Sequence, residues 1–179
     1  MQVVYELSNE SKFLNQYYQL REKCYRVDLK LSEFNGAEEA RDRTGHILIA
    51  RRGDRCIGGA RICNASSLLD AIPELQLPSG NCCAWERFCL DSEVRSTELA
   101  RDFCGKLIEY SRGFGFEHAV MLSSFRNARF YRLLHSALGL EFTIGKKIQG
   151  IAAPQFAGLE HYLSYSTLQP EYRLQRMAA

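Results

Sequence analysis

Apolar side chains follow two different spacings along the chain, and the spacing predicts which segments are strands and which are helices. Short apolar runs bounded by turn residues are typical of strands. Seven segments have this pattern: residues 2–7, 46–50, 56–63, 82–90, 118–123, 140–149 and 161–168. Apolar positions at steps of three and four predict helices in three longer segments: residues 10–26, 97–112 and 125–138. The order of these segments predicts a mixed α/β sheet with helices on its faces.

The first helix should present an apolar stripe to this sheet. The stripe consists of Phe13, Tyr17, Leu20 and Cys24. Ser8 is the expected N-cap of this helix, and either Ser96 or Thr97 can cap the next long helix, which ends near residue 112. The polar residues 28–45 predict a loop with a short helix near the sequence AEEAR. In the strand at 56–63, Gly58 and Gly59 predict a bulge or a close approach of another segment.

The segment 82–90 reads as a buried strand except for two adjacent charges, Glu86 and Arg87. Alternation along a strand places Glu86 with Phe88 on one face and Arg87 with Trp85 on the other. The two charges therefore should not be partners of each other. Each needs its own countercharge or a water-lined cleft, because an isolated buried charge costs several kcal/mol.

Arg61 poses the same problem in the neighbouring strand, and Arg21 and Asp42 are available countercharges. Two interpretations stay open. In the first, these groups form an ion-pair network that only stabilises the fold. In the second, they line a cleft that binds a charged small molecule. The members of this group are Arg21, Asp42, Arg61, Glu86 and Arg87.

Composition narrows the class of protein. A chain of 179 residues with 46% hydrophobic residues can form one domain with a real core, which we place at 1–168, followed by a basic tail at 169–179. The net charge of +2 is too small to indicate nucleic-acid binding. The seven cysteines have no metal-binding spacing and suggest reduced core thiols. Without a signal peptide or a membrane-spanning apolar run, we expect a cytoplasmic protein with no bound metal.

An ordered set of motifs between residues 1 and about 150 resembles the acyl-homoserine lactone (autoinducer) synthases. The set comprises Arg21-x-x-x-Tyr25, the acidic loop ending at Asp42, then HILI, Gly59-Ala-Arg61-Ile and Trp85-Glu86-Arg87-Phe88. Those enzymes are N-acyltransferases of the GNAT fold, and the long-chain N-acyl amino acid synthases are similar in layout. The resemblance implies a GNAT-like fold with a central, mostly antiparallel sheet flanked by helices.

Position by position, Arg21, Tyr25, Asp42, Arg61, Glu86 and Arg87 match the family pattern, and Glu39 matches a further acid. Three positions depart from it. The tryptophan expected after Tyr25 is absent, with Leu31 nearest. Glu39 stands where the family has aspartate. The family has an acid three residues before the arginine of this strand, and Ala84 occupies that position here. Glu86, one residue before Arg87, would have to present the carboxylate instead. The acceptor stays open between S-adenosylmethionine, the family's normal substrate, and another amine.

The resemblance implies roles for these residues in acyl transfer from a thioester to a primary amine. Glu86 would be the general base, made more basic by burial against Trp85 and Phe88. Arg61 and Arg87 would clamp a carboxylate or phosphate. Asp42 would hold the amine or ribose of the acceptor. The catalytic residues are thus Glu86, Arg87 and Asp42, and the substrate-binding residues are Arg21, Tyr25, Glu39, Arg61, Trp85 and Phe88.

The acyl donor is expected to be a thioester of acyl carrier protein or coenzyme A, without any tightly bound cofactor. The segment 91–96 lacks the glycines of a pyrophosphate loop, which favours the carrier protein, and Arg95 would contact phosphate at the helix start. A basic group could dock the acidic carrier protein or simply be solvated; it comprises Arg126, Arg129, Arg132, Lys146 and Lys147. Either His135 or Tyr131 could protonate the leaving thiol, or both could be core residues.

The expected function is therefore N-acyl transfer of the acyl-homoserine lactone synthase type, as used in autoinducer synthesis for quorum sensing. Two alternatives remain. One is the same fold acylating an amino acid or another amine. The other is a non-catalytic module that binds acyl groups or their carrier protein.

Overall fold

The fold is taken from a computed structural model that describes residues 2–69, 72, 75–148, 156 and 158–169. The order of its elements is the predicted one, including the short helix in the polar segment 28–45, here α2, and a 3₁₀ turn η1 is added. The elements are β1 (Val4–Leu7), α1 (Ser11–Asp28), α2 (Ala40–Thr44), β2 (His46–Arg52), β3 (Arg55–Asn64), η1 (Ala65–Leu68), β4 (Cys82–Leu90), α3 (Thr97–Gly113), β5 (His118–Ser123), α4 (Phe125–Ala137), β6 (Phe142–Ile148) and β7 (His161–Thr167).

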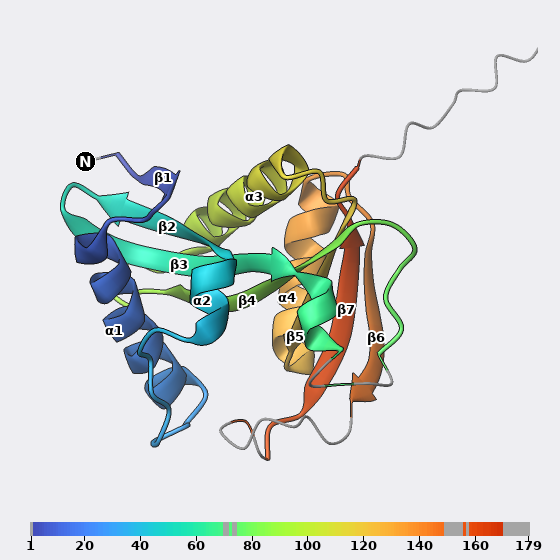
Figure 1. Cartoon of the computed structure of the whole chain (residues 1–179), viewed down its shortest axis with the longest axis horizontal. Coiled ribbons are helices and arrows are strands. Elements are labelled where there is room, and N and C mark those ends of the chain that lie inside the picture. The colour runs from blue at the N-terminus through green and yellow to red at the C-terminus, as the bar shows by residue number, and fades with distance from the viewer. Residues whose placement is uncertain (1, 70–71, 73–74, 149–155, 157, 170–179) are drawn as a thin grey trace, which may run out of the picture.

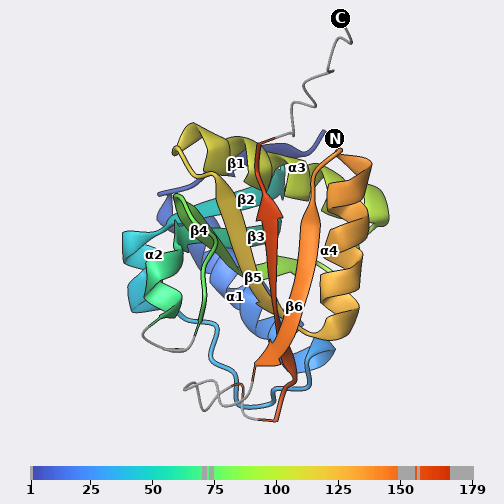
Figure 2. The same ribbon diagram turned by 90° about the vertical axis from the view of Figure 1, so that its right-hand side faces the viewer.

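Seven strands form one sheet in the order β1-β2-β3-β4-β5-β7-β6. All neighbouring strands are antiparallel except β4 and β5, which are parallel. Helices α1 and α2 lie on one side of the sheet, and α3 and α4 lie on the other (Figures 1 and 2). The predicted fold class, a mostly antiparallel mixed sheet flanked by helices, is confirmed.

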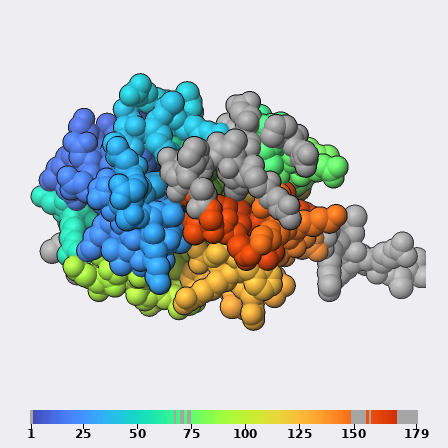
Figure 3. Space-filling model, turned by 90° about the horizontal axis from the view of Figure 1, so that it is seen from below, coloured from blue at the N-terminus to red at the C-terminus, as the bar shows by residue number. Residues whose placement is uncertain are grey.

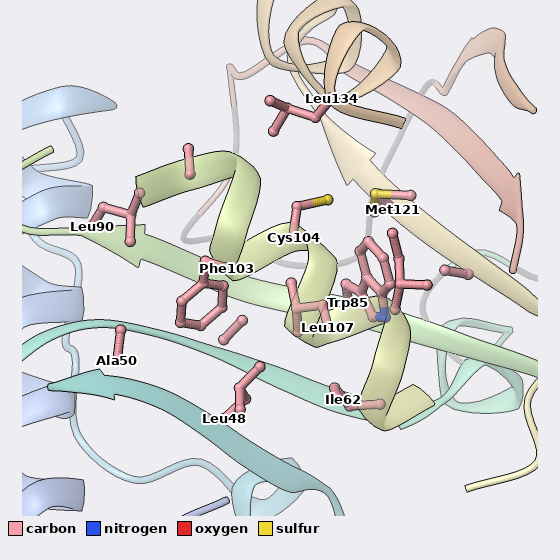
Figure 4. Packing of buried hydrophobic residues seen from close by; sticks show 14 of the residues in the cluster. Leu48, Ala50, Ile62, Trp85, Leu90, Phe103, Cys104, Leu107, Met121 and Leu134 are labelled. Carbon is pink, nitrogen blue, oxygen red and sulfur yellow. The ribbon is translucent and has the colours of Figure 1, made fainter. Parts of the chain in front are cut away.

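The main hydrophobic core lies between the sheet and helices α3 and α4 (Figure 4). Phe103 and Leu107 of α3 are 0% and 1% exposed and pack against strand residues such as Leu48 and Ile62. Burying a side chain of this size stabilises the fold by roughly 1.5–3 kcal/mol. This core anchors the side of β4 that carries Trp85.

Helix α1 covers the opposite side of the sheet with the predicted stripe. Its four members, Phe13, Tyr17, Leu20 and Cys24, are all buried. Gly59 of β3 allows this contact, because a Cβ atom there would lie 2.3 Å from the Tyr17 ring. The close approach predicted for the glycine pair is therefore confirmed.

The helix boundaries show one wrong prediction. The N-cap of α1 is Glu10 rather than Ser8, whose hydroxyl instead accepts a hydrogen bond from the Glu10 N–H at 3.3 Å. Of the two caps predicted for α3, Ser96 is confirmed, since its hydroxyl accepts from the Leu99 N–H at 3.0 Å. Both serines satisfy N–H groups that a helix start leaves unpaired.

Apart from Gln169, the predicted basic tail at 169–179 lies outside the described residues. Of the helices in the described part of the chain, none is long and apolar enough to cross a membrane.

Candidate functional site

The site begins where β4 and β5 separate. Their parallel pairing ends at Ala84 and Val120, although β4 continues to Leu90 and β5 to Ser123. A cavity of about 1510 Å³ opens at this divergence, with walls from α1, α2, β4, α3, β5 and α4. Figure 3 shows the face on which α1 (blue) lies beside β7 (red) and α4 (amber). A large concave site between diverging strands is a natural place for a ligand.

A buried ion-pair network supports one wall of this cavity. The Arg21 guanidinium contacts the Asp42 carboxylate at 3.1 Å, and Arg61 Nη1 contacts the other Asp42 oxygen at 2.8 Å. The side chains of all three are at most 1% exposed. Arg21 also donates to the Gly36 carbonyl at 2.8 Å. Asp42, which was named as an available countercharge, therefore pairs with both Arg61 and Arg21. Arg21 and Asp42 do not line the cavity and position other groups.

Helix α2 brings two acids to this network through a reciprocal capping box. The Glu39 side chain accepts from the backbone of Asp42, and the Asp42 carboxylate accepts from the Glu39 N–H at 2.7 Å. Glu39 Oε2 also accepts from Arg61 at 2.8 Å. This local hydrogen bonding explains why a polar segment forms a helix of only five residues at this point.

Glu86 reaches the cavity from β4 with both carboxylate oxygens occupied. Its Oε2 accepts from Arg61, with the Nε–H at 2.9 Å, and its Oε1 accepts from Arg41 Nη1 at 2.6 Å. Its side chain is 12% exposed. Packing against Trp85 and Phe88 was the expected environment of Glu86, whereas the structure places two guanidinium groups on its carboxylate.

Arg87 lies on the same side of β4 as Glu86, so the prediction that it shares a face with Trp85 is wrong. Two β4 residues, Arg87 and Phe88, stand opposite Ala60 alone, and Arg87 has a φ of +57°. This β-bulge breaks the alternation. The strained conformation costs roughly 1–2 kcal/mol and is held by a hydrogen bond from the Tyr17 hydroxyl to the Arg87 carbonyl at 3.0 Å.

The Arg87 guanidinium forms a forked ion pair with Glu39. Its Nη2 donates to Oε1 at 2.8 Å, and its Nε donates to Oε2 at 3.0 Å. Burial alone would raise the pKa of Glu39, but hydrogen bonds and attraction from Arg87 and Arg61 outweigh it and lower the pKa to about 2. Glu39 is therefore ionised in the folded protein at neutral pH.

The bulge also moves Phe88 to the opposite face from the one predicted. Its ring packs edge-on against Phe103 of α3 and Tyr131 of α4. Trp85 lies on this same side, where its indole N–H donates to the Ser111 hydroxyl at 2.9 Å. Both residues line the cavity. They form its apolar wall, whereas Glu86 and Arg87 form its charged wall.

Aromatic rings enclose the charged wall. Tyr25 stacks on Phe34 with ring centroids 4.5 Å apart, and the Arg87 guanidinium lies 4.8 Å from the Phe156 ring centre. Burial raises the pKa of the Tyr25 hydroxyl to about 12 despite the opposing effect of Arg87. Tyr25 thus lines the cavity as a neutral group, in keeping with its predicted place near the substrate.

A comparison with models of protein families identifies the family of this chain. A model described as "Acetyltransferase (GNAT) family" matches residues 5–135, which is more than half of the 179-residue chain. The chain belongs to the GNAT acetyltransferase family. No curated protein matches its sequence.

Solved GNAT-fold structures resemble this family member over most of its length. The acyl-homoserine lactone synthase LasI has a TM-score of 0.72 at 14% identity, covering 94% of this chain and 91% of its own. The CoA-dependent synthase BjaI with SAM and isopentyl-CoA has 0.66 at 15%, covering 88% and 76%. FeeM, an N-acyl amino acid synthase from uncultured soil microbes, has 0.61 at 12%, covering 92% and 89%. At these identities the similarity establishes the GNAT fold that the resemblance implied.

In this GNAT domain the start of α3 forms one end of the cavity. Arg95, Ser96 and Thr97 line it. The Arg95 guanidinium pairs with Asp28 at the end of α1, at 2.7 Å, so it is held beside the helix start. The N–H groups and dipole of this helix start favour an anion, which suits the predicted phosphate contact.

The predicted basic group on and near α4 divides into two parts. Arg126 lines the cavity, and Arg129 and Arg132 are exposed further along the helix. Exposed Phe125 and Leu133 accompany these arginines, at 48% and 68% exposure. The fourth and fifth members, Lys146 and Lys147, lie on β6, and Lys147 pairs with Glu160.

The structure separates the two candidate acids on α4. Tyr131 lines the cavity, and burial raises the pKa of its hydroxyl, which therefore keeps its proton. His135 is 0% exposed, and its ring packs between Trp85 and Phe142. His135 is not among the residues that line the cavity. Tyr131 can reach a bound ligand, whereas His135 belongs to the core.

The sequence did not single out three residues of this site. Arg41 holds one oxygen of Glu86, and Phe34 and Phe156 flank Arg87. Arg41 lies in a run of charged residues that resembles any solvated segment. Phe34 and Phe156 could have been noticed in the sequence, because each is the one aromatic residue in a polar or loop-like stretch, where large apolar side chains are uncommon.

Proposed function

We propose that this GNAT-family chain transfers an acyl group from a thioester to a primary amine, as an acyl-homoserine lactone synthase acting on S-adenosylmethionine. The observation that carries the proposal is the single cavity of about 1510 Å³. It joins the charged wall with Glu86 and Arg87 to the starts of α3 and α4. One cavity can thus hold an amine at one end and the phosphates of a phosphopantetheine arm at the other.

The chemistry follows from the groups on the two walls. Glu86 accepts a proton from the acceptor ammonium group, and the free amine attacks the thioester carbonyl to form a C–N bond. The oxyanion that develops is stabilised by backbone N–H groups of β4 beyond Ala84, where no β5 partner pairs with them. The C–S bond then breaks, and the nitrogen's remaining extra proton passes to the leaving thiolate. With S-adenosylmethionine as acceptor, the carboxylate of the acylated compound then attacks its γ-carbon, the bond from that carbon to the sulfonium sulfur breaks, and the lactone forms with release of methylthioadenosine.

Tyr131 stands on the apolar wall, next to Phe88. Its protonated hydroxyl offers a hydrogen bond to the leaving sulfur. Buried Asp42 and Arg21 act one step away, because they position Arg61 and Glu39 and do not line the cavity. Arg61 lines the cavity and holds Glu86 and Glu39. The role assigned to Asp42 therefore changes from holding the acceptor to positioning the acids that line the cavity.

The donor is proposed to be acyl carrier protein or coenzyme A. Exposed arginines and apolar side chains share one face of α4, as an acidic helical partner with an apolar strip would require. Binding of the carrier protein should then weaken as salt is raised. The structural neighbour BjaI is CoA-dependent, which makes an acyl-CoA the matched donor to test.

An amino acid is the second candidate acceptor. FeeM, one of the structural neighbours, is an N-acyl amino acid synthase. Both candidates place an α-amino group beside a carboxylate. Incubating the purified protein with acyl-CoA or acyl carrier protein and either acceptor, followed by mass spectrometry, separates acyl-homoserine lactone from acyl amino acid. No acylated product with either donor would contradict the proposal and favour a binding module.

Glu86→Gln tests the assignment of the base. We expect product formation to fall by about 10²–10⁴-fold, the usual contribution of a general base. The melting temperature should change much less, because the amide can still accept from one arginine. The matched control is Glu38→Gln, an exposed acid paired with Arg43 and not among the residues lining the cavity. Unchanged activity in Glu86→Gln would reduce the charged wall to a structural network.

A further inference from the structure

The proposed base already accepts hydrogen bonds from arginine on both oxygens. Oε2 of Glu86 accepts from Arg61, and Oε1 accepts from Arg41. A general base needs an oxygen within hydrogen-bond reach of the amine. A second lone pair on Oε1 can serve the amine, but an ammonium group beside two guanidinium groups is favoured when one of them turns to another anion. If the proposed function holds, we expect one of these arginines to turn away from Glu86 when the acceptor binds.

The two arginines differ in how deeply they are buried. Arg61 is 1% exposed and also contacts Glu39 and Asp42, both at 2.8 Å. Its departure would remove one cation from three acids at once. The Arg41 side chain is 32% exposed, extends from the five-residue helix α2 and lines the cavity. Arg41 is the partner that can leave.

We infer that Arg41 recognises the carboxylate of a zwitterionic acceptor and, on turning to it, frees Oε1 of Glu86 for the acceptor's ammonium group. An α-amino carboxylate fits between the two side chains because it offers each half of the Arg41–Glu86 pair the opposite charge. Neither side chain is then left without a countercharge, so the pair can open at little electrostatic cost.

The charges of the surrounding group favour the same ligand. Four arginines, Arg21, Arg41, Arg61 and Arg87, face three acids, Glu39, Asp42 and Glu86. A zwitterion leaves the net charge of this group unchanged. An amine without a carboxylate would add a positive charge beside these arginines, which the site disfavours.

The chain carries its own reporter for acceptor binding. Trp85 is the only tryptophan, adjoins Glu86 and lines the cavity. Tryptophan fluorescence can therefore follow titration of S-adenosylmethionine and of the common L-amino acids, each compared with the amine produced by its decarboxylation. The wild type should bind a carboxylate-bearing compound at least about 10-fold more tightly than the matched amine.

Arg41→Met should weaken binding of that compound by about 10–100-fold, while binding of the decarboxylated amine should change less than about two-fold. Arg41→Lys should restore part of the loss, because lysine keeps the positive charge but lacks the paired N–H donors of the guanidinium group. Arg43→Met is the matched control and should bind like the wild type. It removes an exposed arginine of the same helix whose partner is Glu38, outside the cavity.

Equal binding of carboxylate and amine by the wild type, equal losses for both in Arg41→Met, or no binding of any carboxylate compound would overturn the inference. Arg41-dependent binding without acyl transfer would support the recognition role while the proposed function failed. Transfer to a simple amine at the same rate in wild type and Arg41→Met would support the proposed function and overturn the role of Arg41.

Discussion

The two faces of β4 are built on opposite physical principles. On the face toward α1 and α2, Glu86 and Arg87 join a network in which each charge meets an opposite charge. On the face toward α3 and α4, Trp85 and Phe88 pack among apolar side chains. One polar ring, that of His135, lies among them with its Nε2 unpaired in the described part of the chain. Because of the bulge at Arg87, Glu86 and Arg87 lie on one face of β4, and Phe88 joins Trp85 on the other.

The difference between the two faces indicates which of them serves ligand binding. An apolar face of this kind stabilises a fold by burial, at roughly 25 cal/mol per Å². A buried ion-pair network is often no more stable than apolar residues of the same volume, and it becomes strongly destabilising when one member is lost. A network retained beside a large cavity therefore suggests that its charges serve a ligand.

The largest expected effect comes from removing the cation at the centre of the network. Arg61→Met leaves Glu39, Asp42 and Glu86 facing one another with less compensation. The free energy of unfolding should fall by about 3–5 kcal/mol, measured by urea denaturation at pH 7. Arg43→Met, which breaks an exposed pair, should change it by less than about 1 kcal/mol. A loss below about 1 kcal/mol in Arg61→Met would show that the network is solvated.

The next effect depends on pH and concerns Glu39. Its pKa is about 2 in the folded protein and 4.5 as an unperturbed group. The unfolded chain therefore binds more protons as the pH falls below about 4.5, and the stability that the ionised Glu39 supplies is lost between about pH 4.5 and 2.

Glu39→Gln should therefore lower stability at pH 7 by about 1–3 kcal/mol, since the amide only partly replaces the bonds to Arg87 and Arg61. The difference from the wild type should stay constant down to about pH 5 and shrink toward pH 3. Urea unfolding at four pH values between 7 and 3 measures both, with Glu38→Gln as the exposed control. A gap that stays constant to pH 3 would contradict the ionised pairing of Glu39.

Most of the scaffold could be predicted from the sequence because its signals are local. The strand predicted at 82–90 has those bounds in the structure, and all four members of the α1 stripe are buried. Asp42 could be named in advance as a countercharge for Arg61, since a charge among apolar residues requires one. These predictions depended on periodicity and charge balance, which a single segment displays by itself.

The site was less predictable because its decisive features are not local. Arg87 adopts a positive φ without being glycine, so no residue type marks the bulge that turns it toward Glu39. The pairing of Arg41 with Glu86 joins residues 45 positions apart. Neither contact follows from spacing in one segment. The resemblance grouped residues that the structure brings together, such as Arg61 and Glu86, and the structure supplied the directions of their side chains.

The smallest expected effect tests the lone polar group on the apolar face. Burial lowers the pKa of His135, so its ring is neutral in the folded protein, while the unfolded chain takes up a proton below about pH 6.5. His135 therefore costs stability as the pH falls from 6.5. His135→Phe removes the unpaired Nε2 and the bond between Nδ1 and the Tyr131 carbonyl at 2.8 Å.

These two losses should nearly cancel, so His135→Phe should lie within about 1 kcal/mol of the wild type at pH 8. At pH 5 the variant should gain relative to the wild type, by no more than about 2 kcal/mol, the limit set by 1.5 pH units of proton uptake. Acyl transfer should be unchanged at both pH values, because His135 does not line the cavity. A folded variant without activity would instead place this ring in the reaction beside Tyr131.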